Sequence, residues 1–174
     1  MYAVICVFLY LHPPCNTAPS HIVSLNIQNL TTMASINPYL TFKGNCEEAF
    51  EFYKSVFGGE FAMKSRFGEM PSEQSCSESE ANLIMHVALP IGTNTILMGS
   101  DQPDGYGPFN AGNNFSIAVS PDSEEQAAQF FNGLSSGGEV IVPMDKTFWG
   151  AFFGMVKDKY GVQWMVNYQL EQPK

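Results

Sequence analysis

His86 is the residue of this chain best suited to acid–base chemistry. It lies in the apolar stretch "LIMHVAL", and an imidazole titrates near neutral pH, so it can hold or transfer a proton or orient a ligand by hydrogen bonding. No carboxylate accompanies it in the local pattern. The second interpretation is an interior histidine that hydrogen-bonds to a backbone carbonyl or a neighbouring Asn, and the residues alone leave both open.

A group of aromatic residues around two glycines is the second chemical feature. The stretch "KTFWGAFFG", residues 146–154, carries Trp149 at its centre. Such a group can form a wall that stacks against a flat or apolar ligand. Alternatively, it is a hairpin between two strands whose aromatic side chains fill the interior or a seam between two copies of the chain.

The charged residues argue against several function classes. Lys plus Arg number 8 and Asp plus Glu 17, a formal net charge of -9, so there is no cationic surplus for nucleic acid or an anionic membrane. The pairs Glu47-Glu48 and Glu124-Glu125 begin predicted helices, where acids favour the N-terminal dipole. The sequence contains no P-loop or dinucleotide fingerprint, and no glycine loop that would support methyl transfer.

Residues 1–32 differ from the rest because they contain no Lys, Arg, Asp or Glu. Their apolar run "AVICVFLYL" is too short to span a bilayer as a helix, and no basic residue precedes it as in a signal peptide. We expect 1–32 to be a leader outside the working protein, 33–174 to be the working domain, and the location to be cytoplasmic, with export as the alternative. Cys46 and Cys76 lack CxxC spacing and a His that would complete a zinc site, which favours free thiols.

The chain after residue 33 repeats one order of elements, strand, helix and three strands. In each half, apolar side chains at helical spacing follow a short β-rich stretch and end at a Gly-Gly pair. The predicted modules cover about 34–101 and about 113–170, and the polar stretches 68–81 and 101–114 are predicted loops. Each module is too small to bury a comfortable core alone, so the two should fold against each other. The predicted strands are 36–42, 60–67, 82–91, 94–100, 115–120, 139–144, 152–158 and 162–169, and the predicted helices are 46–57 and 122–136.

Four stretches resemble one known superfamily: "NPYLTFKGNCEEAFEFYKSVFGGE", "IMHVALPIGTNTILMGSD", "GGEVIVPMDKTFWGAFFG" and "DKYGVQWMVNY". Through them residues 34–169 resemble the vicinal oxygen chelate superfamily (glyoxalase I, bleomycin-resistance proteins, extradiol dioxygenases), and within it the PhnB-like branch, often labelled with a demethylubiquinone methyltransferase name. The resemblance implies an α+β fold of two βαβββ modules that form a half-barrel, with helices on the outer face and a ligand cleft inside. A homodimer commonly completes that cleft.

Given this fold, the alternation of side chains along each strand separates a packed face from a cleft face. The packed face should hold Pro38, Leu40, Phe42, Met85, Val87, Leu89, Phe115, Ile117, Val119, Val162, Trp164 and Val166. The cleft face should hold Ile84, Ala88, Ala118 and the ligand-binding candidates, which are Asn37, Tyr39, Thr41, His86, Asn114, Ser116, Gln163, Met165 and Asn167, with Trp149 added from the aromatic group.

The same register bears on metal binding. Metal-dependent relatives carry His, Glu or Gln on the first and last strands of each module, where this chain has Asn37, Asn114 and Met165 and, at the fourth place, the residues "TILM". Amides and a thioether are poor ligands for a hard or borderline divalent ion. We therefore predict no metal ligands and no cofactor, and a divalent metal is disfavoured.

These observations favour a PhnB-like protein that binds a small organic molecule in a metal-poor cleft, in the manner of the resistance proteins it resembles. The alternative is an enzyme of the same superfamily, of lyase or isomerase type, that uses His86 with or without a metal. A third hypothesis is an accessory role through the surface of a homodimer.

Overall fold

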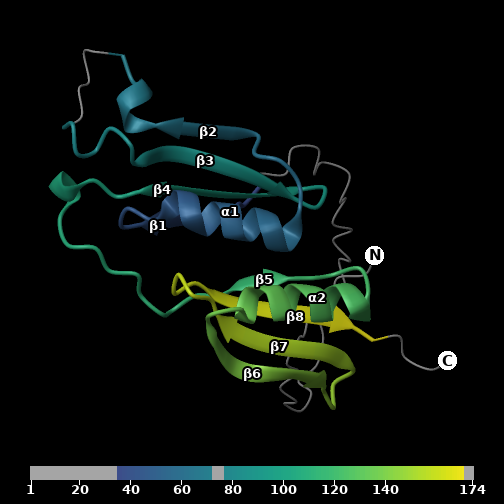
Figure 1. Cartoon of the computed structure of the whole chain (residues 1–174). Helices are drawn as coiled ribbons and strands as arrows, with labels where there is room; N and C mark the ends of the chain where they lie inside the picture. Colours follow the sequence, from purple (N-terminus) through teal and green to yellow (C-terminus); the bar gives the residue numbers. More distant parts are fainter. Residues whose placement is uncertain (1–34, 72–76, 171–174) are drawn as a thin grey trace, which may run out of the picture. The chain divides into compact units, whose positions relative to one another are not determined.

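The computed structural model describes residues 35–71 and 77–170, so the predicted leader and the centre of the 68–81 loop lie outside the described residues. Within the described part, no helix has the length and apolar character needed to cross a membrane. The elements, in chain order, are β1 (Tyr39–Phe42), α1 (Cys46–Phe57), β2 (Met63–Arg66), η2 (Phe67–Glu69), β3 (Ile84–Ile91), β4 (Thr95–Asp101), η4 (Asp104–Tyr106), β5 (Ile117–Val119), α2 (Glu124–Ser135), β6 (Glu139–Lys146), β7 (Ala151–Lys157) and β8 (Gln163–Gln169) (Figure 1).

The strands form two four-stranded sheets of the same layout. The first sheet has the order β1-β4-β3-β2 and the second the order β5-β8-β7-β6. Strand β1 pairs with β4 in parallel, and β5 pairs with β8 in parallel. The other neighbouring strands are antiparallel. Helix α1 lies against the first sheet and α2 against the second (Figure 1). The predicted α+β fold of two βαβββ modules is therefore confirmed.

Both helices follow from local sequence signals. In α1, Glu47 and Glu48 lie in the first turn, and Gly58 ends the helix with a φ of 78° that a residue with a side chain rarely adopts. In α2, the hydroxyl of Ser123 accepts a hydrogen bond from the backbone N–H of Gln126 at 3.1 Å. The apolar side of each helix is buried against its sheet.

A glycine allows each helix to approach its sheet closely. A Cβ at Gly99 in β4 would lie 2.6 Å from the Phe50 ring of α1, and a Cβ at Gly154 in β7 would lie 2.5 Å from the Phe131 ring of α2. Real Cβ atoms do not tolerate such contacts, so each ring occupies the space that a side chain would need. The two modules therefore use the same packing device.

A buried carboxylate joins the two modules. Asp158 is 4% exposed and follows β7. Its Oδ2 accepts a hydrogen bond from the phenol of Tyr53 in α1 and another from the indole N–H of Trp164 in β8, both at 2.8 Å. Its Oδ1 accepts the backbone N–H groups of Tyr160 and Val162. Because the side chains of both modules also share one hydrophobic core, the modules fold as a unit.

Ile84 and Phe115 depart from the predicted packing, and Met85, which was expected on the packed face, lies outside the core cluster. Ile84 was expected on the cleft face but is 1% exposed and belongs to the core, because the register between β2 and β3 shifts at Ser65/Arg66 and reverses the alternation there. Phe115 was expected in the core but is 51% exposed, because β5 begins only at Ile117. Both predictions were wrong for the same reason, since strand alternation holds only inside an unbroken strand.

Candidate functional site

Among the described residues, α1 packs on one face of the first sheet and no helix covers the other face, which we call the open face. Cross-strand partners point to the same side of a sheet, so the register places Tyr39, Met98, Ala88 and Met63 in one row across β1, β4, β3 and β2. Beside this row lie Thr41 and Ser100, which are paired, and His86 and Ser65, also paired. The side chains that face α1 alternate with these and are buried, among them Leu40, Val87 and Leu97. The open face therefore carries thioethers, hydroxyls, one phenol and one imidazole.

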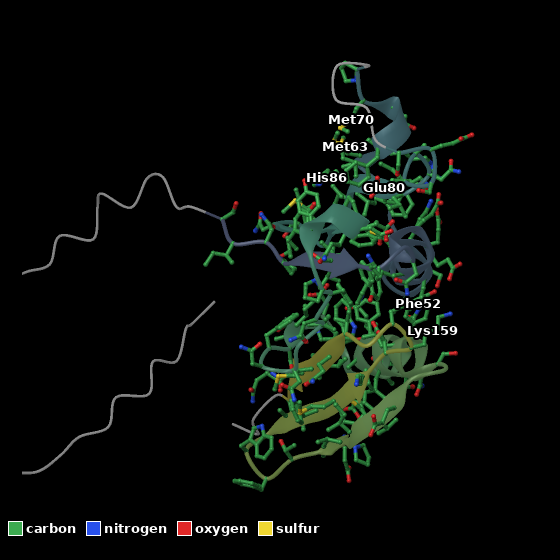
Figure 2. The ribbon with its side chains drawn as sticks, turned by 90° about the vertical axis from the view of Figure 1, so that its left-hand side faces the viewer. Phe52, Met63, Met70, Glu80, His86 and Lys159 are labelled. Atoms are coloured by element: carbon green, nitrogen blue, oxygen red, sulfur yellow. The ribbon has the colours of Figure 1, made fainter. Side chains whose placement is uncertain are left out.

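Tyr39 and His86 form a pair on the open face. The Tyr39 hydroxyl lies 3.4 Å from Nδ1 of His86, and the two rings stack with centroids 5.8 Å apart and planes 29° apart. Figure 2 shows His86 on the first sheet together with Met63. Tyr39 is 48% exposed and His86 is half-buried, so both are accessible to a ligand. The second nitrogen of the imidazole is left for a further partner.

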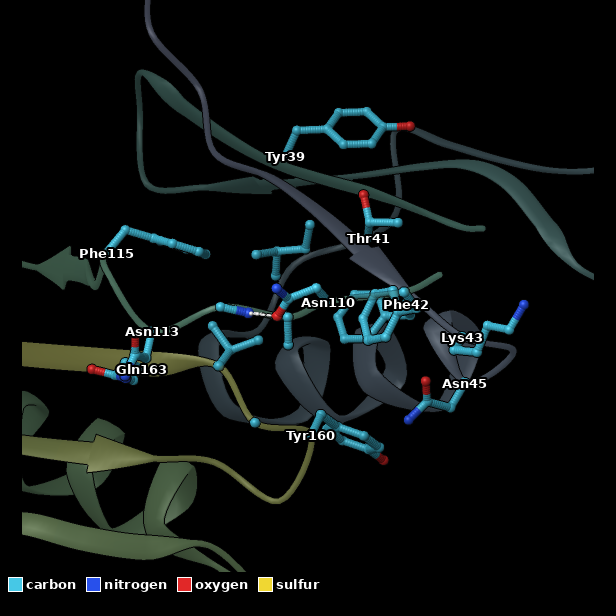
Figure 3. Close-up of a pocket in the computed structure, with 16 residues that line it drawn as sticks. Tyr39, Thr41, Phe42, Lys43, Asn45, Asn110, Asn113, Phe115, Tyr160 and Gln163 are labelled. Carbon is cyan, nitrogen blue, oxygen red and sulfur yellow. Dashed lines mark hydrogen bonds between the residues drawn. The ribbon is translucent and has the colours of Figure 1, made fainter. Parts of the chain in front are cut away.

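A pocket of about 420 Å³ begins at Tyr39 and extends along β1, and we call it the β1 pocket (Figure 3). Its walls come from β1, from the loop that joins the two modules, and from the approach to β8. The lining residues are Tyr39, Leu40, Thr41, Phe42, Lys43, Asn45, Phe109, Asn110, Ala111, Gly112, Asn113, Phe115, Tyr160, Gly161, Val162 and Gln163.

The lining of the β1 pocket is polar but almost without charge. It includes four side-chain amides and several aromatic rings, and none of its residues is Asp, Glu, His or Cys. Its one cation, Lys43, is paired with Asp104 at 2.6 Å. The hydrogen bond and charge of Lys43 hold the pKa of Asp104 below its ordinary value, so this carboxylate stays ionised at neutral pH. The pocket can therefore hydrogen-bond and stack against a neutral molecule.

The predicted site residues of the first module divide into two groups. Tyr39 and Thr41 lie on the open face and line the β1 pocket, and His86 contacts Tyr39. Asn37 precedes β1, and its side-chain oxygen accepts the backbone N–H of Ile96 at 2.9 Å while its amide donates to Ser35 at 3.4 Å. Asn37 thus has a structural partner at each end of its amide.

The predicted site residues of the second module are spread over the second sheet. Gln163 lines the β1 pocket and accepts a hydrogen bond from Ser116 at 3.4 Å. Met165 and Asn167 follow along β8, opposite Met155 and Phe153 of β7. Asn114 is exposed ahead of β5.

Trp149 lies in the turn between β6 and β7. Its ring is 51% exposed and packs edge-on against Phe148, with centroids 4.8 Å apart, and against Phe153, with centroids 6.1 Å apart. Phe148 itself is 98% exposed. The aromatic group is thus a hairpin end, as one of the two interpretations predicted, and its rings are open to a partner rather than enclosed in a core.

Sequence reasoning missed the loop wall of the β1 pocket. Phe109, Asn110 and Asn113 lie in the stretch predicted only as a linker between modules, and Tyr160 lies in a turn. The one available signal was composition, because two aromatics and three asparagines are an unusual content for a simple connection. Nothing local indicated that this loop returns to β1.

The donor set does not suit a divalent metal. The described residues contain no group of three or more His, Cys, Asp or Glu side chains that could hold an ion. Where metal-dependent proteins of this fold would need carboxylate or imidazole, Asn37 is engaged with backbone and Met165 offers a thioether. We therefore derive no step that uses a metal.

The fold of this chain is found in other solved structures. The paired βαβββ modules match those of a glyoxalase-related enzyme from Fulvimarina pelagi (16% identity, TM-score 0.54, covering 79% of this chain and 89% of the other). They also match those of the fosfomycin resistance protein FosX from Listeria monocytogenes (10%, 0.54, 81% and 95%). At these identities the likeness concerns the fold alone. The chain therefore shares the fold of these two proteins.

More similar proteins narrow the class. Residues 34–167 match the family model described as 3-demethylubiquinone-9 3-methyltransferase, and the chain belongs to that PhnB-like family. It is 32% identical over 148 residues to Protein YjdN from Escherichia coli, covering 79% of this chain and 97% of that protein. It resembles the crystal structure of PA1353 from Pseudomonas aeruginosa, with 39% identity, a TM-score of 0.72, and coverage of 80% of this chain and all of the other. The predicted resemblance is confirmed.

Proposed function

We propose that this protein binds a small, uncharged organic molecule between the open face and the β1 pocket, without a metal. The observation that carries the proposal is the pocket of about 420 Å³ beside Tyr39, lined by amides, hydroxyls and rings and by no acidic side chain. Ligand sites in proteins typically enclose roughly 300–1,000 Å³ and combine apolar walls with a few oriented polar groups. Because Lys43 is neutralised by Asp104, an anionic ligand would find no free cation in this lining.

The experiment is ligand recovery followed by a blocking variant. The full chain is incubated with unfractionated cell extract, washed and denatured, and the released small molecules are identified by mass spectrometry. Ala111→Trp, which places a ring in the pocket lining, should abolish recovery, whereas Ala62→Trp at an exposed position outside the lining should not. Recovery that is equal in both variants would refute the β1 pocket as the site.

A second candidate function is acid–base catalysis, and the Tyr39–His86 contact favours it. A phenol 3.4 Å from an imidazole nitrogen can orient the ring and exchange a proton with it. Under this hypothesis His86→Ala abolishes turnover of a recovered ligand but retains its binding, while under pure sequestration no turnover is found with either protein. Elemental analysis, together with thermal shifts in nickel, zinc and manganese, tests the metal-free part of the proposal, and one tightly held ion per chain would contradict it.

We also propose a homodimer in the cytoplasm. Apolar residues are exposed on both sheets, including Ile96 on the first and Val140, Ile141 and Val142 on the second, and a second copy would cover such surface. The free thiol of Cys46 supports a reducing compartment. Light scattering after size exclusion gives the mass: twice 19.2 kDa supports the dimer, and 19.2 kDa at micromolar concentration contradicts it.

A further inference from the structure

The row of side chains across the open face consists of Tyr39, Met98, Ala88 and Met63, and Ala88 has the shortest side chain of the four. Ala88 stands between Met63 on one side and Met98 on the other, as their cross-strand pairing shows. Ala88 carries only a methyl group and is 7% exposed, so it lies beneath the flexible thioethers of its two neighbours. We call these three residues the thioether trough.

The second sheet lacks this feature in the row that contains Ala118. There the row runs from Ala118 in β5 through Met165 in β8 to Met155 in β7. Strand β7 has the same place in the second sheet as β3 has in the first. In this row β7 carries Met155, whose long side chain fills the space that Ala88 leaves open in the first sheet. The trough is a property of the first module and does not follow from the repeated fold.

The chemistry around the trough selects a class of ligand. Thioether sulfur atoms make favourable contacts with aromatic rings, and a methyl floor between two of them leaves room for a flat group. Tyr39 closes one end of the row, and His86 stands beside it with one ring nitrogen directed to the Tyr39 hydroxyl. No ionised carboxylate or ammonium lies among the side chains of this row or the adjacent one. The surroundings thus suit a planar ring with a hydroxyl or carbonyl group and no net charge.

We propose that the thioether trough is the ring-binding subsite of this protein and that its ligands are planar, uncharged aromatic molecules bearing a hydrogen-bonding oxygen. The inference rests on the proposed binding function and assigns its ligand class. The ring lies over Ala88 between Met63 and Met98, and the oxygen meets His86 or Tyr39. Met63, at 50% exposure, can move over a bound ring without disturbing the core.

The test compares two probes of one carbon skeleton, 2-naphthol and decahydro-2-naphthol, on the full chain labelled with 13C at the methionine methyl groups. We expect 2-naphthol to bind about tenfold more tightly, since only the flat ring gains sulfur–aromatic contacts. Its ring current should shift the methyl signals of Met63 and Met98 upfield, with assignments from Met63→Leu and Met98→Leu. Ala88→Leu fills the trough and should remove binding.

A second variant guards against misfolding. Met63→Ala changes a half-exposed side chain and should weaken 2-naphthol binding about fivefold, while Met70→Ala, outside the row, should leave it unchanged. Equal affinity for the two probes, no binding of 2-naphthol up to its solubility, or shifts confined to other methionines would each overturn the inference. The binding function would still stand in those cases if the extract-derived ligand were recovered and were lost in Ala111→Trp, so the two failures are distinguishable.

Discussion

Replacing Asp158 by Asn tests whether a single buried carboxylate holds the two modules together. The carboxylate accepts four hydrogen bonds, two from side chains and two from backbone. An amide of the same shape offers one oxygen and one NH2 group. Its oxygen can accept either the two side-chain donors or the two backbone donors, but not both sets. If its oxygen faces the backbone, its NH2 group meets the indole N–H of Trp164, which can only donate. The side chains of Trp164 and Tyr53 are 1% and 0% exposed, so water cannot compensate.

The cost follows from these losses. A buried donor left without an acceptor costs about 1–3 kcal/mol, and hydrogen bonds to a charged group contribute about 1.5–3 kcal/mol each. The Tyr53 hydroxyl recovers part of its loss by accepting from the new NH2 group. We therefore expect Asp158→Asn to lower the free energy of unfolding by about 3 kcal/mol, a large part of the total for a domain of this size.

Urea denaturation at neutral pH, followed by tryptophan fluorescence and circular dichroism, measures this change. Asp122→Asn, at an exposed position, is the matched control and should change stability by less than about 0.5 kcal/mol. Tyr53→Phe should cost about 1–2 kcal/mol in the wild-type background and less in the Asp158→Asn background, because the partner is then already altered. A loss below about 1 kcal/mol for Asp158→Asn would refute the claim that this carboxylate joins the modules.

Further predictions concern the core and the surface of the first module. Gly99→Ala should destabilise by about 1–3 kcal/mol in urea titrations because its Cβ would enter the space of an α1 ring, while Gly105→Ala, with no atom within 4 Å, should not. The hydrogen bonds from Arg66 lower the pKa of Glu47 below its ordinary 4.5, so the pair stabilises above that pH and is lost as the pH falls through the lower, folded-state value. Between about pH 5 and pH 3 the wild type should therefore lose up to about 1 kcal/mol more than Glu47→Gln, and an equal loss in both would contradict the assignment. Burial raises the pKa of the Cys46 thiol, so peptide mapping after iodoacetamide treatment at about pH 8 should find it unlabelled until urea is added.

The helices and the repeated order of strands were predictable because their signals are local. The spacing of apolar residues and the Gly-Gly stop predicted α1 at residues 46–57, and the structure has Cys46–Phe57. The second helix, predicted at 122–136, begins two residues later, where Ser123 caps it. The prediction that the acidic residues in the first turn of α1 have a structural role is supported, since Glu47 pairs with Arg66 of β2.

Contacts between distant parts of the chain were not predictable in the same way. Tyr53 and Asp158 are separated by 105 positions, and nothing near either residue indicates the other. The loop wall of the β1 pocket is similar, since Asn110 and Asn113 have the composition of a linker and gain their place only where the chain returns to β1. A single sequence shows the alternation of side chains along each strand, but it does not show which distant residues a loop or turn contacts.

Strand alternation lies between these cases, and it decides how far the candidate site could be inferred. It correctly put Tyr39 and His86 on one face, because β1 is regular and the β2–β3 register holds at Ser65 and His86. It failed for Ile84, beyond the register shift. Alternation also cannot reveal which residues are cross-strand neighbours, and the thioether trough depends on that, because its three residues come from three strands. The side chains that face a ligand can thus be inferred one strand at a time, whereas the shape they form together depends on which residues of neighbouring strands are paired.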